Sequence, residues 1–587
     1  MFKTNDYIDC LNDIENNQGV KNLRPLKIAV LRSYTVEPLE PILRLRFILE
    51  EYNPQFAYGG YGQYAQEALD DKSFLYVFKP DIVLFLLRSG DLLPGFYGEY
   101  NGKSFFQWQQ IMESTVEQLG ACAIAIREKL DSRILVQNMG FEDLLYWGVY
   151  DAQRTQNQIH LIHELNRALI ARLTPIANTF VWDYNHFVSR KGYETLYDPK
   201  MWYISKNPFK YSAYPEIAND LFRYFAAAMG KVKKCIVLDL DNALWGGVVG
   251  EDGFERIQLG EDYPGACYRD MQKELLKLYH RGILLAINSK NNEEEVFEVI
   301  DKHPGMILRR KHFAAHRVNW KDKATNLEEL AQELNIGIDS MIFIDDNPLE
   351  CELVRQLHPE CTVIELPEKK YKLPGTIQAL FNVENINITE EDKKKGEIYQ
   401  SQIERKKVQQ AASSLEEYLK SLDVVVSIKE ADSFSVPRIA QLTQKTNQMN
   451  LTTRRYFEAE IESFMKSPLS SVFYVSVKDR LGDHGIVGVI ILKIEGEKCL
   501  IDTFLLSCRV LGLTIEQSML AHIQERARES GCKQLVGEYI PTKKNTPAAG
   551  FYEAANFKKQ GDFLFVFDLK SREIPLSPYI TLGVSGS

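Results

Sequence analysis

The sequence predicts an α/β protein built from three domains. At roughly 150 residues per domain, a chain of 587 residues has room for three or four folded units. In its first two regions, short apolar strands alternate with helical segments, which is the pattern of parallel α/β sheets. In its last region, several strands come before one helix, which predicts a smaller mixed sheet.

The first predicted domain covers residues 1–230. Its apolar strands are expected at 26–34, 80–90 and 132–140, and each one ends in small polar residues. Because helical segments separate these strands, we expect them to pair in parallel within one sheet.

The second predicted domain covers residues 231–372. Its strands are expected at 233–242, 281–291 and 339–348, and each runs directly into polar residues. The following segment, 373–422, is charged and helical in pattern, which predicts a connector rather than a further domain.

The third predicted domain covers residues 423–570 and is followed by a loose tail at 571–587. Its strands are separated by short polar turns, and its helix follows the last long strand. The expected strands are 424–430, 471–480, 486–496 and 499–507, and the expected helix is 515–530.

Composition excludes several classes of protein. With 45% hydrophobic and 26% charged residues, the chain is neither disordered nor fibrous. Its net charge of −10 disfavours general nucleic-acid binding, which needs a basic face. No apolar run reaches the roughly 18–20 residues of a membrane span, and the N-terminus lacks the order of a secretory signal. We expect a cytoplasmic protein that binds neither nucleic acid nor membrane.

The ends of the three strands in the second domain carry residues suited to phosphate chemistry. In open parallel sheets, ligands bind where the carboxyl ends of the strands meet. Strand-end carboxylates can hold Mg²⁺, which offsets the repulsion between an attacking carboxylate and a phosphate. The expected metal ligands are Asp239, Asp241, Asp345 and Asp346, and the expected phosphate-binding residues are Ser289 and Lys323.

Each of these residues has an expected role. Asp239 is the candidate nucleophile, which would carry the phosphoryl group as an aspartyl phosphate. Asp241 would protonate the leaving oxygen and then activate water. Ser289 and Lys323 would hold the oxygens of the transferring group. A single Asp-x-Asp pair is usually a turn, but six groups in this order, at or between strand ends, indicate a phosphate site.

This order of motifs resembles the haloacid dehalogenase superfamily of aspartate-dependent phosphatases. The first motif stands here as Asp239-Leu-Asp241-Asn242-Ala243, with Ala243 where Thr or Val is usual. Over residues 231–560, segments such as LDLDNALWGGVVGEDG, INSKNNEEEV and SCRVLG resemble the FkbH-like family, whose members work in polyketide pathways.

The longer FkbH-like proteins begin with a hydrolase-like domain of the SGNH type, and residues 1–230 are similar to it. The catalytic signature of that type is poor in this chain, since Ser33 lacks the usual Gly-Asp lead-in and Gly90-Asp91 is a remnant of a later block. We therefore expect a degenerate domain with a structural or docking role.

A basic stretch at 308–323 stands out against the acidic chain. It is compatible with a solvated helix face or loop. The alternative is that Arg309, Arg310 or Arg317 recognises a second phosphate of the substrate or an acidic carrier protein.

A second candidate site lies in the third domain. If Ile494 faces Cys499 in an antiparallel hairpin, Cys508 falls opposite Gly485, beside His484 and Asp483. A thiol next to an imidazole is the arrangement that yields a thiolate nucleophile, although an isolated Cys after a strand is usually inert packing. Cys508 and His484 are therefore candidate catalytic residues.

The residues after Cys508 resemble the phosphate-binding loop of the GCN5-related acetyltransferases (GNAT). The pattern R-x-x-G-x-T is formed by Arg509, Gly512 and Thr514, which would cradle a phosphopantetheine arm. Leu513 stands where the FkbH-like loop has a basic residue. Further lining candidates are Asn447, Gln448, Asn450, Thr452 and Tyr552, the last as an acid.

The fold class implied by these resemblances is a three-domain α/β chain: SGNH-like, HAD-like Rossmannoid and GNAT-like. The FkbH-like resemblance implies transfer of a glyceryl group from 1,3-bisphosphoglycerate to the phosphopantetheine thiol of an acyl carrier protein, with Cys508 as a relay. Two alternatives stay open: a phosphatase joined to a coenzyme A-dependent N-acyltransferase, and a non-catalytic scaffold that docks a carrier.

Overall fold

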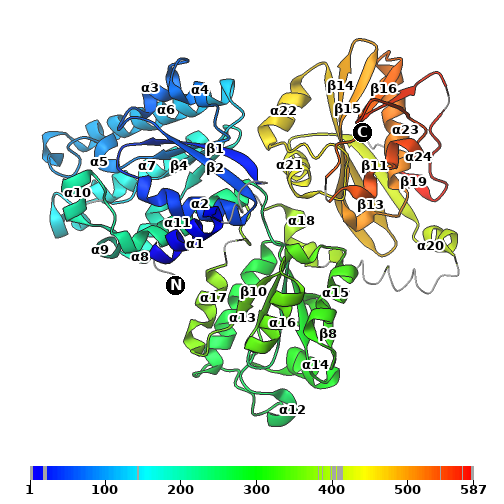
Figure 1. The fold of residues 1–587 in the computed structure, drawn as a ribbon, viewed down its shortest axis with the longest axis horizontal. Coiled ribbons are helices and arrows are strands. Elements are labelled where there is room, and N and C mark those ends of the chain that lie inside the picture. Colours follow the sequence, from blue (N-terminus) through cyan, green and yellow to red (C-terminus); the bar gives the residue numbers. More distant parts are fainter. Residues whose placement is uncertain are drawn as a thin grey trace. The chain divides into compact units, whose positions relative to one another are not determined.

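The computed structural model describes residues 4–16, 23–141, 145–380, 382–386, 388–396, 398–399, 405, 414–542, 544–571 and 573–583. The chain divides into two compact units, Met1–Ala228 and Met229–Ser587. The first unit holds one sheet and the second unit holds two, so the described strands form three sheets in all (Figure 1). Among the described helices, none has the length and apolar character needed to cross a bilayer.

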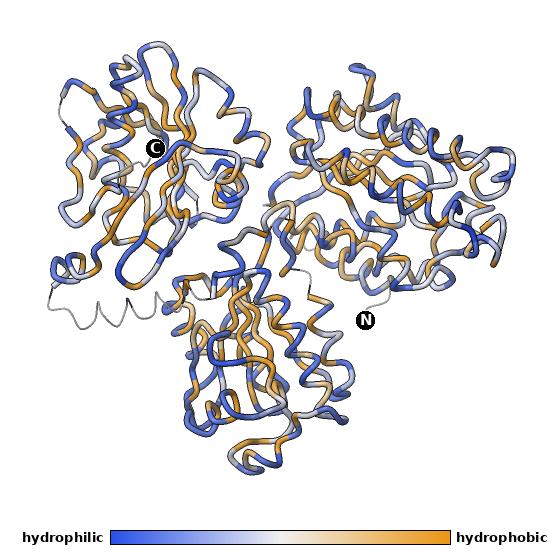
Figure 2. Tube along the Cα trace, turned by 180° about the vertical axis from the view of Figure 1, so that it is seen from behind, coloured by the Kyte–Doolittle hydropathy of each residue, from blue (hydrophilic) through white to orange (hydrophobic). Residues whose placement is uncertain are grey.

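The first unit contains a five-stranded parallel sheet of order β2-β1-β3-β4-β5. Its central strands are apolar and buried, as the orange core of this unit in Figure 2 shows. The strands are β1 (Arg24–Arg32), β2 (Tyr52–Tyr58), β3 (Ile82–Leu86), β4 (Arg133–Gln137) and β5 (Thr179–Trp182). The helices are α1 (Thr4–Asn16), α2 (Glu40–Leu49), α3 (Tyr64–Leu69), α4 (Phe74–Phe78), α5 (Ser89–Leu92), α6 (Phe105–Lys129), α7 (Gln158–Leu173), α8 (Tyr184–Lys191), α9 (Tyr193–Leu196), α10 (Pro199–Ser205) and α11 (Tyr214–Ala228).

The second unit begins with a parallel sheet of order β10-β9-β6-β7-β8. The three predicted strands form its centre, and β8 and β10 are edge strands that the apolar pattern did not indicate. The strands are β6 (Cys235–Leu238), β7 (Leu284–Ser289), β8 (Phe313–Val318), β9 (Met341–Asp345) and β10 (Thr362–Glu365). The helices are α12 (Val249–Asp252), α13 (Gly265–His280), α14 (Glu293–Lys302), α15 (Lys323–Leu334), α16 (Pro348–Leu357) and α17 (Leu373–Gln378).

The segment assigned to the connector begins inside this domain. Leu373 and Ile377 of α17 lie in the same buried cluster as the strands and α13, because their apolar side chains complete one face of the sheet. Two short helices of the connector are described, α18 (Glu390–Lys393) and α20 (Leu415–Ser421). Most of residues 400–413 lie outside the described part of the chain.

The rest of the second unit is a mixed sheet of order β17-β18-β16-β15-β14-β13-β11-β19, with β12 pairing β15. The predicted loose tail contributes strand β19, which pairs in parallel with β11. The strands are β11 (Val424–Glu430), β12 (Met449–Asn450), β13 (Ser470–Asp479), β14 (Gly482–Glu495), β15 (Lys498–Leu506), β16 (Gln534–Glu538), β17 (Lys558–Gln560), β18 (Leu564–Asp568) and β19 (Ile580–Leu582). The helices are α21 (Val436–Lys445), α22 (Glu458–Lys466), α23 (Ile515–Glu529) and α24 (Phe551–Ala554).

Candidate active site

Three carboxylates meet at the carboxyl edge of the first sheet in the second unit. Strands β6 and β9 are parallel neighbours, with Leu238 opposite Ile344, so the residues that follow them leave the sheet side by side. Asp239, Asp345 and Asp346 each offer an oxygen, and these oxygens all lie within 4.8 Å of one another. Asp239 is 6% exposed and Asp345 is fully buried, so two of the three carboxylates are withdrawn from bulk water.

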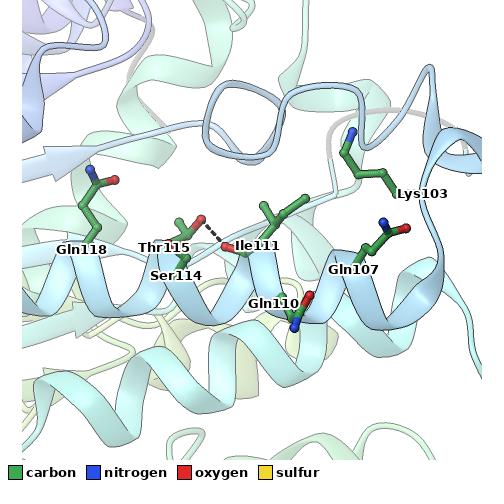
Figure 3. Close-up of a pocket in the computed structure, with 7 residues that line it drawn as sticks. All are labelled: Lys103, Gln107, Gln110, Ile111, Ser114, Thr115 and Gln118. Carbon is green, nitrogen blue, oxygen red and sulfur yellow. Dashed lines mark hydrogen bonds between the residues drawn. The ribbon is translucent and has the colours of Figure 1, made fainter.

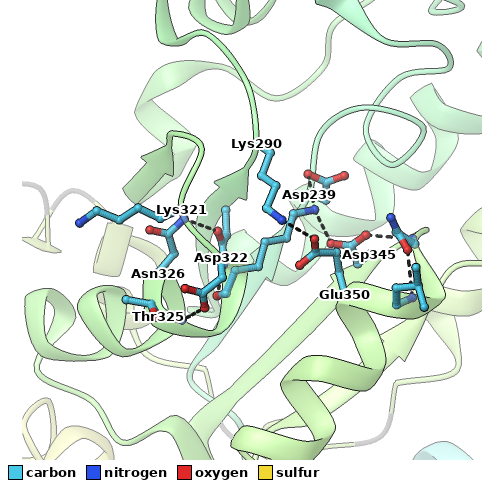
Figure 4. Close-up of polar contacts among 12 residues, drawn as sticks. Asp239, Lys290, Lys321, Asp322, Thr325, Asn326, Asp345 and Glu350 are labelled. Atoms are coloured by element: carbon cyan, nitrogen blue, oxygen red, sulfur yellow. Dashed lines mark hydrogen bonds and ion pairs between the residues drawn. The ribbon is translucent and has the colours of Figure 1, made fainter.

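Lys323 joins two of these carboxylates. Its Nζ lies 3.0 Å from Asp239 Oδ1 and donates to Asp345 Oδ2 at 2.6 Å (Figure 4). Burial alone would lower the pKa of Lys323, but Asp239 and Asp345 outweigh burial and raise it. Burial, and then Asp239, raise the pKa of Asp345. Lys323 is therefore a buried cation, and the sequence prediction that it lies at the phosphate site agrees with its position.

The position of Lys323 is fixed by its helix. Lys323 is the first residue of α15, and the side chain of Asp322 caps that helix by accepting from Thr325 N at 2.7 Å. Behind it, Asn288 Nδ2 donates to Lys323 O at 2.8 Å, and Asn326 donates to Asn288 Oδ1 at 3.1 Å. These buried amides tie α15 to β7 and hold the ammonium group over the carboxylates. The strand-end pattern gave no sign of them.

The Asp241 side chain lies outside the three-carboxylate cluster. Its Oδ1 accepts from Trp245 Nε1 at 2.8 Å and from Val249 N at 3.1 Å, while Oδ2 accepts from Asn291 Nδ2 at 2.7 Å. Burial, the largest influence, raises the pKa of Asp241 above its ordinary value. Asp241 is therefore not among the clustered carboxylates, although it was predicted as a metal ligand, and its role as an acid or base stays a prediction.

The loop after Asp241 places these donors. Asn242 has a φ of +55°, in the left-handed region that Asn tolerates better than most residues. Its side chain accepts from Gly247 N at 2.9 Å, which closes the loop and brings Trp245 back towards Asp241. Ala243 is fully buried in the domain core, so the position that usually carries Thr or Val serves packing in this chain.

Ser289 is the last residue of β7 and is 1% exposed. Strand β7 is the neighbour of β6 on the side opposite β9. Ser289 therefore lies at the same edge of the sheet as the three carboxylates. Its neighbour Lys290 pairs with Glu350 at 2.6 Å, which links the loop after β7 to α16, the helix that follows β9.

The basic stretch at 308–323 contains strand β8, not an open basic face. Arg309 donates to the backbone oxygen of Ile300 at 2.8 Å, and Arg310 pairs with Asp301 at 2.8 Å. Arg317 pairs with Glu329 at 2.7 Å and also with Glu333. Each of these three guanidinium groups has a partner within the domain, so recognition of a second phosphate or a carrier by Arg309, Arg310 or Arg317 stays a prediction.

The hairpin predicted for the third domain forms, with Ile494 opposite Cys499. Its register shifts by one residue at Asp502, because Leu492 faces Ile501 but Ile491 faces Thr503. Strand β15 ends at Leu506, and Cys508 begins a single helical turn, Cys508–Val510. Cys508 therefore does not face Gly485 across the hairpin.

His484 contacts a different carboxylate from the predicted one. The ring is fully buried, and its Nε2 lies 2.9 Å from Asp479 Oδ2, while Asp483 pairs with Lys478 at 2.9 Å. Burial, the largest influence, lowers the pKa of His484. The other ring nitrogen, Nδ1, accepts or donates no hydrogen bond within the described residues. Since Nε2 is bound to Asp479 and Nδ1 has no hydrogen-bond partner in the described part of the chain, the structure shows no hydrogen bond between His484 and Cys508, and their catalytic pairing stays a prediction.

Cys508 has other neighbours. Its backbone oxygen accepts from Asn335 Nδ2 at 3.2 Å, and its side chain is partly exposed. Burial, and next the nearby Cys508, raise the pKa of Tyr399. The thiol thus lies where the third domain meets residues of the phosphatase-like domain and of the connector.

The residues of the predicted phosphopantetheine cradle are largely used in internal contacts. Arg509 donates to Ser507 Oγ at 3.2 Å, and Thr514 Oγ1 lies 2.5 Å from Ser577 Oγ of the tail. Gly512 has a φ of +83° and faces open space.

Asn447 accepts from Arg455 at 2.6 Å. Among the other lining candidates, Asn450 is in β12, Thr452 donates to Asp502 O, and Tyr552 is 1% exposed against Gly537.

The first unit offers weaker candidates. Ser33 Oγ, at the end of β1, accepts from Arg88 N at 2.9 Å and so supports the loop after β3. A shallow groove on α6 is lined by Lys103, Gln107, Gln110, Ile111, Ser114, Thr115 and Gln118 (Figure 3). Amides and hydroxyls dominate this lining, which holds no carboxylate, imidazole or thiol for acid–base or nucleophilic chemistry.

Family models match two parts of the chain, the first unit and the phosphatase-like domain. Residues 27–223 match the family model of the FkbH N-terminal domain, and residues 234–367 match that of NLI interacting factor-like phosphatases. No curated protein matches the chain.

Solved structures give matches to both parts of the chain. The N-terminal part of a Bacteroides fragilis protein, which contains a phosphatase domain and was solved in complex with Mg, is 28% identical with a TM-score of 0.60. The match covers 66% of this chain and 100% of that one. A Vibrio cholerae spermidine N-acetyltransferase with CoA and spermine matches 24% of this chain and 95% of its own, at 10% identity and a TM-score of 0.20. A Staphylococcus aureus acetyltransferase of the GNAT family matches 25% of this chain and 99% of its own, at 14% identity and a TM-score of 0.20.

The family models and the strand-edge carboxylates lead to the same conclusion. The match to the phosphatase model spans Asp239, Lys323 and Asp345, the residues that form the buried cluster. Residues 27–223 are thus similar to the FkbH N-terminal domain, and residues 234–367, which hold the buried cluster, are similar to a phosphatase domain.

Proposed function

We propose that this protein loads a glyceryl group from 1,3-bisphosphoglycerate onto the phosphopantetheine thiol of an acyl carrier protein, with loss of phosphate. The donor, the acceptor and a role in polyketide-type biosynthesis in the cytoplasm come from the resemblance to FkbH-like proteins. The observation that supports the phosphate chemistry is the buried cluster of Asp239, Asp345 and Lys323, with Asp241 beside it.

The three carboxylates fit a magnesium ion. Asp239, Asp345 and Asp346 offer hard oxygen ligands whose atoms lie within 4.8 Å of one another. The solved relative with a phosphatase domain and Mg supports the same ion for this chain. When bound, Mg²⁺ would offset the negative charges of the phosphate and of the attacking carboxylate.

The positions of the two aspartates support removal of the ester phosphate at carbon 3. An oxygen of Asp239 attacks phosphorus, the bond from phosphorus to the carbon-3 oxygen breaks, and Asp241 gives its proton to that oxygen. Asp241 then takes a proton from water, which attacks the aspartyl phosphate, releases inorganic phosphate and restores Asp239. Lys323 and Ser289 hold the phosphoryl oxygens through both steps.

Acyl transfer is a separate event in this proposal. A thiol attacks the acyl carbon, the bond from that carbon to the phosphate oxygen breaks, and the carbon-1 phosphate leaves as inorganic phosphate. Attack at phosphorus would instead release a free carboxylate and lose the acyl group. We keep Cys508 as the relay thiol because it is free and partly exposed, and we leave His484 out because it is buried against Asp479.

Intact mass measurement of the carrier tests this function. Wild-type protein, Mg²⁺ and 1,3-bisphosphoglycerate should add a glyceryl group to the holo-carrier and nothing to the carrier without its phosphopantetheine arm. Asp239→Asn should leave a phosphoglyceryl group on the carrier, because the ester phosphate stays in place. Cys508→Ala should abolish transfer, whereas Cys10→Ala, a change at an exposed cysteine of the first unit, should not. If the ester phosphate is released but no carrier gains mass, the transfer part of the proposal is wrong.

A further inference from the structure

Most cations on the phosphatase-like domain have an acidic partner within the domain. Lys290 pairs with Glu350, Lys321 with Glu329 and Lys302 with Glu298. Arg310 and Arg317 of the basic stretch are also paired with carboxylates of the domain. Besides Lys323, which lies in the cluster itself, the cations best placed to bind a second phosphate are those without a carboxylate partner.

Three lysines after β10 form such a group. Within the part of the chain that the structure describes, Lys369, Lys370 and Lys372 each lie beyond ion-pair distance of a carboxylate. Lys369 and Lys372 are exposed, and Lys370 is half-buried. On a chain with a net charge of −10, this lysine cluster (Lys369, Lys370 and Lys372) is a local source of positive potential.

The topology of the sheet brings the lysine cluster to the edge where the carboxylates lie. Strand β10 pairs in parallel with β9, with Glu365 directly opposite Asp345. Leu366 N then donates to Asp345 O at 2.8 Å, so the chain leaves β10 at the level of the acidic cluster. Lys370 begins the single helical turn Lys370–Lys372 that follows.

Two contacts place Lys370 near the acidic cluster. Its Nζ lies 5.8 Å from the ring centroid of Tyr268, a weak cation–π distance that leaves the ammonium hydrogens available. Burial, and then Asp239, raise the pKa of Asp346, while Lys370 is the largest of the influences that lower it. Lys370 is thus close enough to act electrostatically on the site without being part of the cluster that Lys323 holds.

We propose that Lys370, supported by Lys369 and Lys372, binds a second phosphate of the substrate, so that the phosphatase-like site prefers a small bisphosphate. This inference rests on the proposed function and deepens it. Once the acyl group is on a thiol, the carbon-1 phosphate is gone and nothing anionic remains to meet Lys370. A site selective for the bisphosphate therefore removes the ester phosphate before acyl transfer.

Two substrates with the same ester test the proposal. Glycerol 3-phosphate and 1,3-bisphosphoglycerate share the phosphate on carbon 3, and only the second carries another phosphate. Lys370→Met should lower kcat/KM for carbon-3 phosphate release from 1,3-bisphosphoglycerate about tenfold or more, the value of one charge-assisted hydrogen bond. For glycerol 3-phosphate, kcat/KM should stay within about twofold. Lys302→Met, at an exposed lysine of α14, is the matched control and should change neither value.

Several outcomes would overturn the proposal. An equal loss with both substrates would mean that Lys370 supports the cluster or the fold, and no loss with either would exclude a role in recognition. An effect confined to the carrier step would assign the lysine cluster to the carrier instead. If the wild type releases phosphate from neither substrate, the proposed function fails. Calorimetric binding of 2,3-bisphosphoglycerate and glycerol 3-phosphate then tests the second phosphate site separately from catalysis. If the wild type and Lys370→Met bind 2,3-bisphosphoglycerate with equal affinity, a second phosphate site at Lys370 is excluded.

Discussion

Replacing Asp241 separates its chemical role from its structural one. The carboxylate accepts three hydrogen bonds, two at Oδ1 from Trp245 and Val249, and one at Oδ2 from Asn291. In Asp241→Asn the amide oxygen can keep the first two donors. The Asn291 amide can turn to present its oxygen to the new NH₂ group, although that oxygen then no longer accepts from Asn292 N. The side chain of the variant therefore retains three partners.

The expected magnitudes follow from these contacts. Hydrogen bonds to a charged group are worth about 1 kcal/mol more than neutral ones, but the variant no longer buries a charge. We expect the free energy of unfolding to change by about 1 kcal/mol or less in Asp241→Asn. In Asp241→Ala three donors lose their acceptor, and since Trp245 is fully buried, the cost should be about 3 kcal/mol or more.

The rate should respond differently from the stability. Loss of a general acid and base lowers kcat by about 10² to 10⁴, or about 3–5 kcal/mol in the activation free energy. The assay is phosphate release from glycerol 3-phosphate with Mg²⁺, read beside a denaturant melt of each variant. Activity of Asp241→Asn within tenfold of the wild type, with an unchanged melt, would refute the acid–base role.

Three further predictions concern other parts of the chain. Asp346→Asn should weaken magnesium binding and raise the Mg²⁺ concentration needed for half-maximal phosphate release, and an unchanged requirement would remove Asp346 from the metal site. Cys508→Ser should abolish glyceryl transfer to the carrier while carbon-3 phosphate release persists, and continued transfer would exclude the relay. Burial, the largest influence, lowers the pKa of His522 to about 4. Between pH 6.5 and 4 the unfolded chain thus binds a proton that the folded chain does not. The free energy of unfolding therefore decreases as the pH is lowered, by up to about 1.4 kcal/mol per pH unit. His522→Gln should flatten that slope in denaturant melts, and an unaltered slope would contradict the burial argument.

The phosphate site was predictable because parallel strands end at one edge. Buried strands β6, β7 and β9 read as apolar runs, and the polar residues that follow them had to meet. Asp239, Asp345 and Lys323 lie together as this argument requires. The edge strands β8 and β10 are short and partly polar, so no apolar run distinguished them from loops.

The partners of Asp241 could not be predicted in the same way. Trp245 and Asn291 reach Asp241 from a loop whose path depends on the left-handed conformation of Asn242. Strand and helix periodicities do not describe the path of such a loop. The sequence pattern therefore could not predict that Trp245 and Asn291 contact Asp241. The carboxylate of Asp241 is held by these donors and is not one of the three clustered carboxylates, which the strand-end pattern did not predict.

The surroundings of Cys508 depend on the register of the hairpin, which the apolar pattern did not fix. A buried Asp within the apolar run CLIDTFLLS was the available signal of irregularity, because an acid in a buried strand needs partners. Asp502 is the residue that shifts the register, and it pairs with Lys493 at 2.7 Å and Arg454 at 3.2 Å. A shift of one residue moves every later pairing, and Cys508 lies beyond the end of β15, in the helical turn that follows it.

The most direct test of the account is to trap the phosphoryl group on the protein. Asp241→Asn, mixed with Mg²⁺ and p-nitrophenyl phosphate, retains the nucleophile and needs no acid for so good a leaving group, but lacks the base for the second step. Intact mass should show a stoichiometric phosphoryl gain, and peptide mapping should assign it to Asp239. A phosphoryl group on another residue, or phosphate release that persists in Asp239→Asn, would contradict the account.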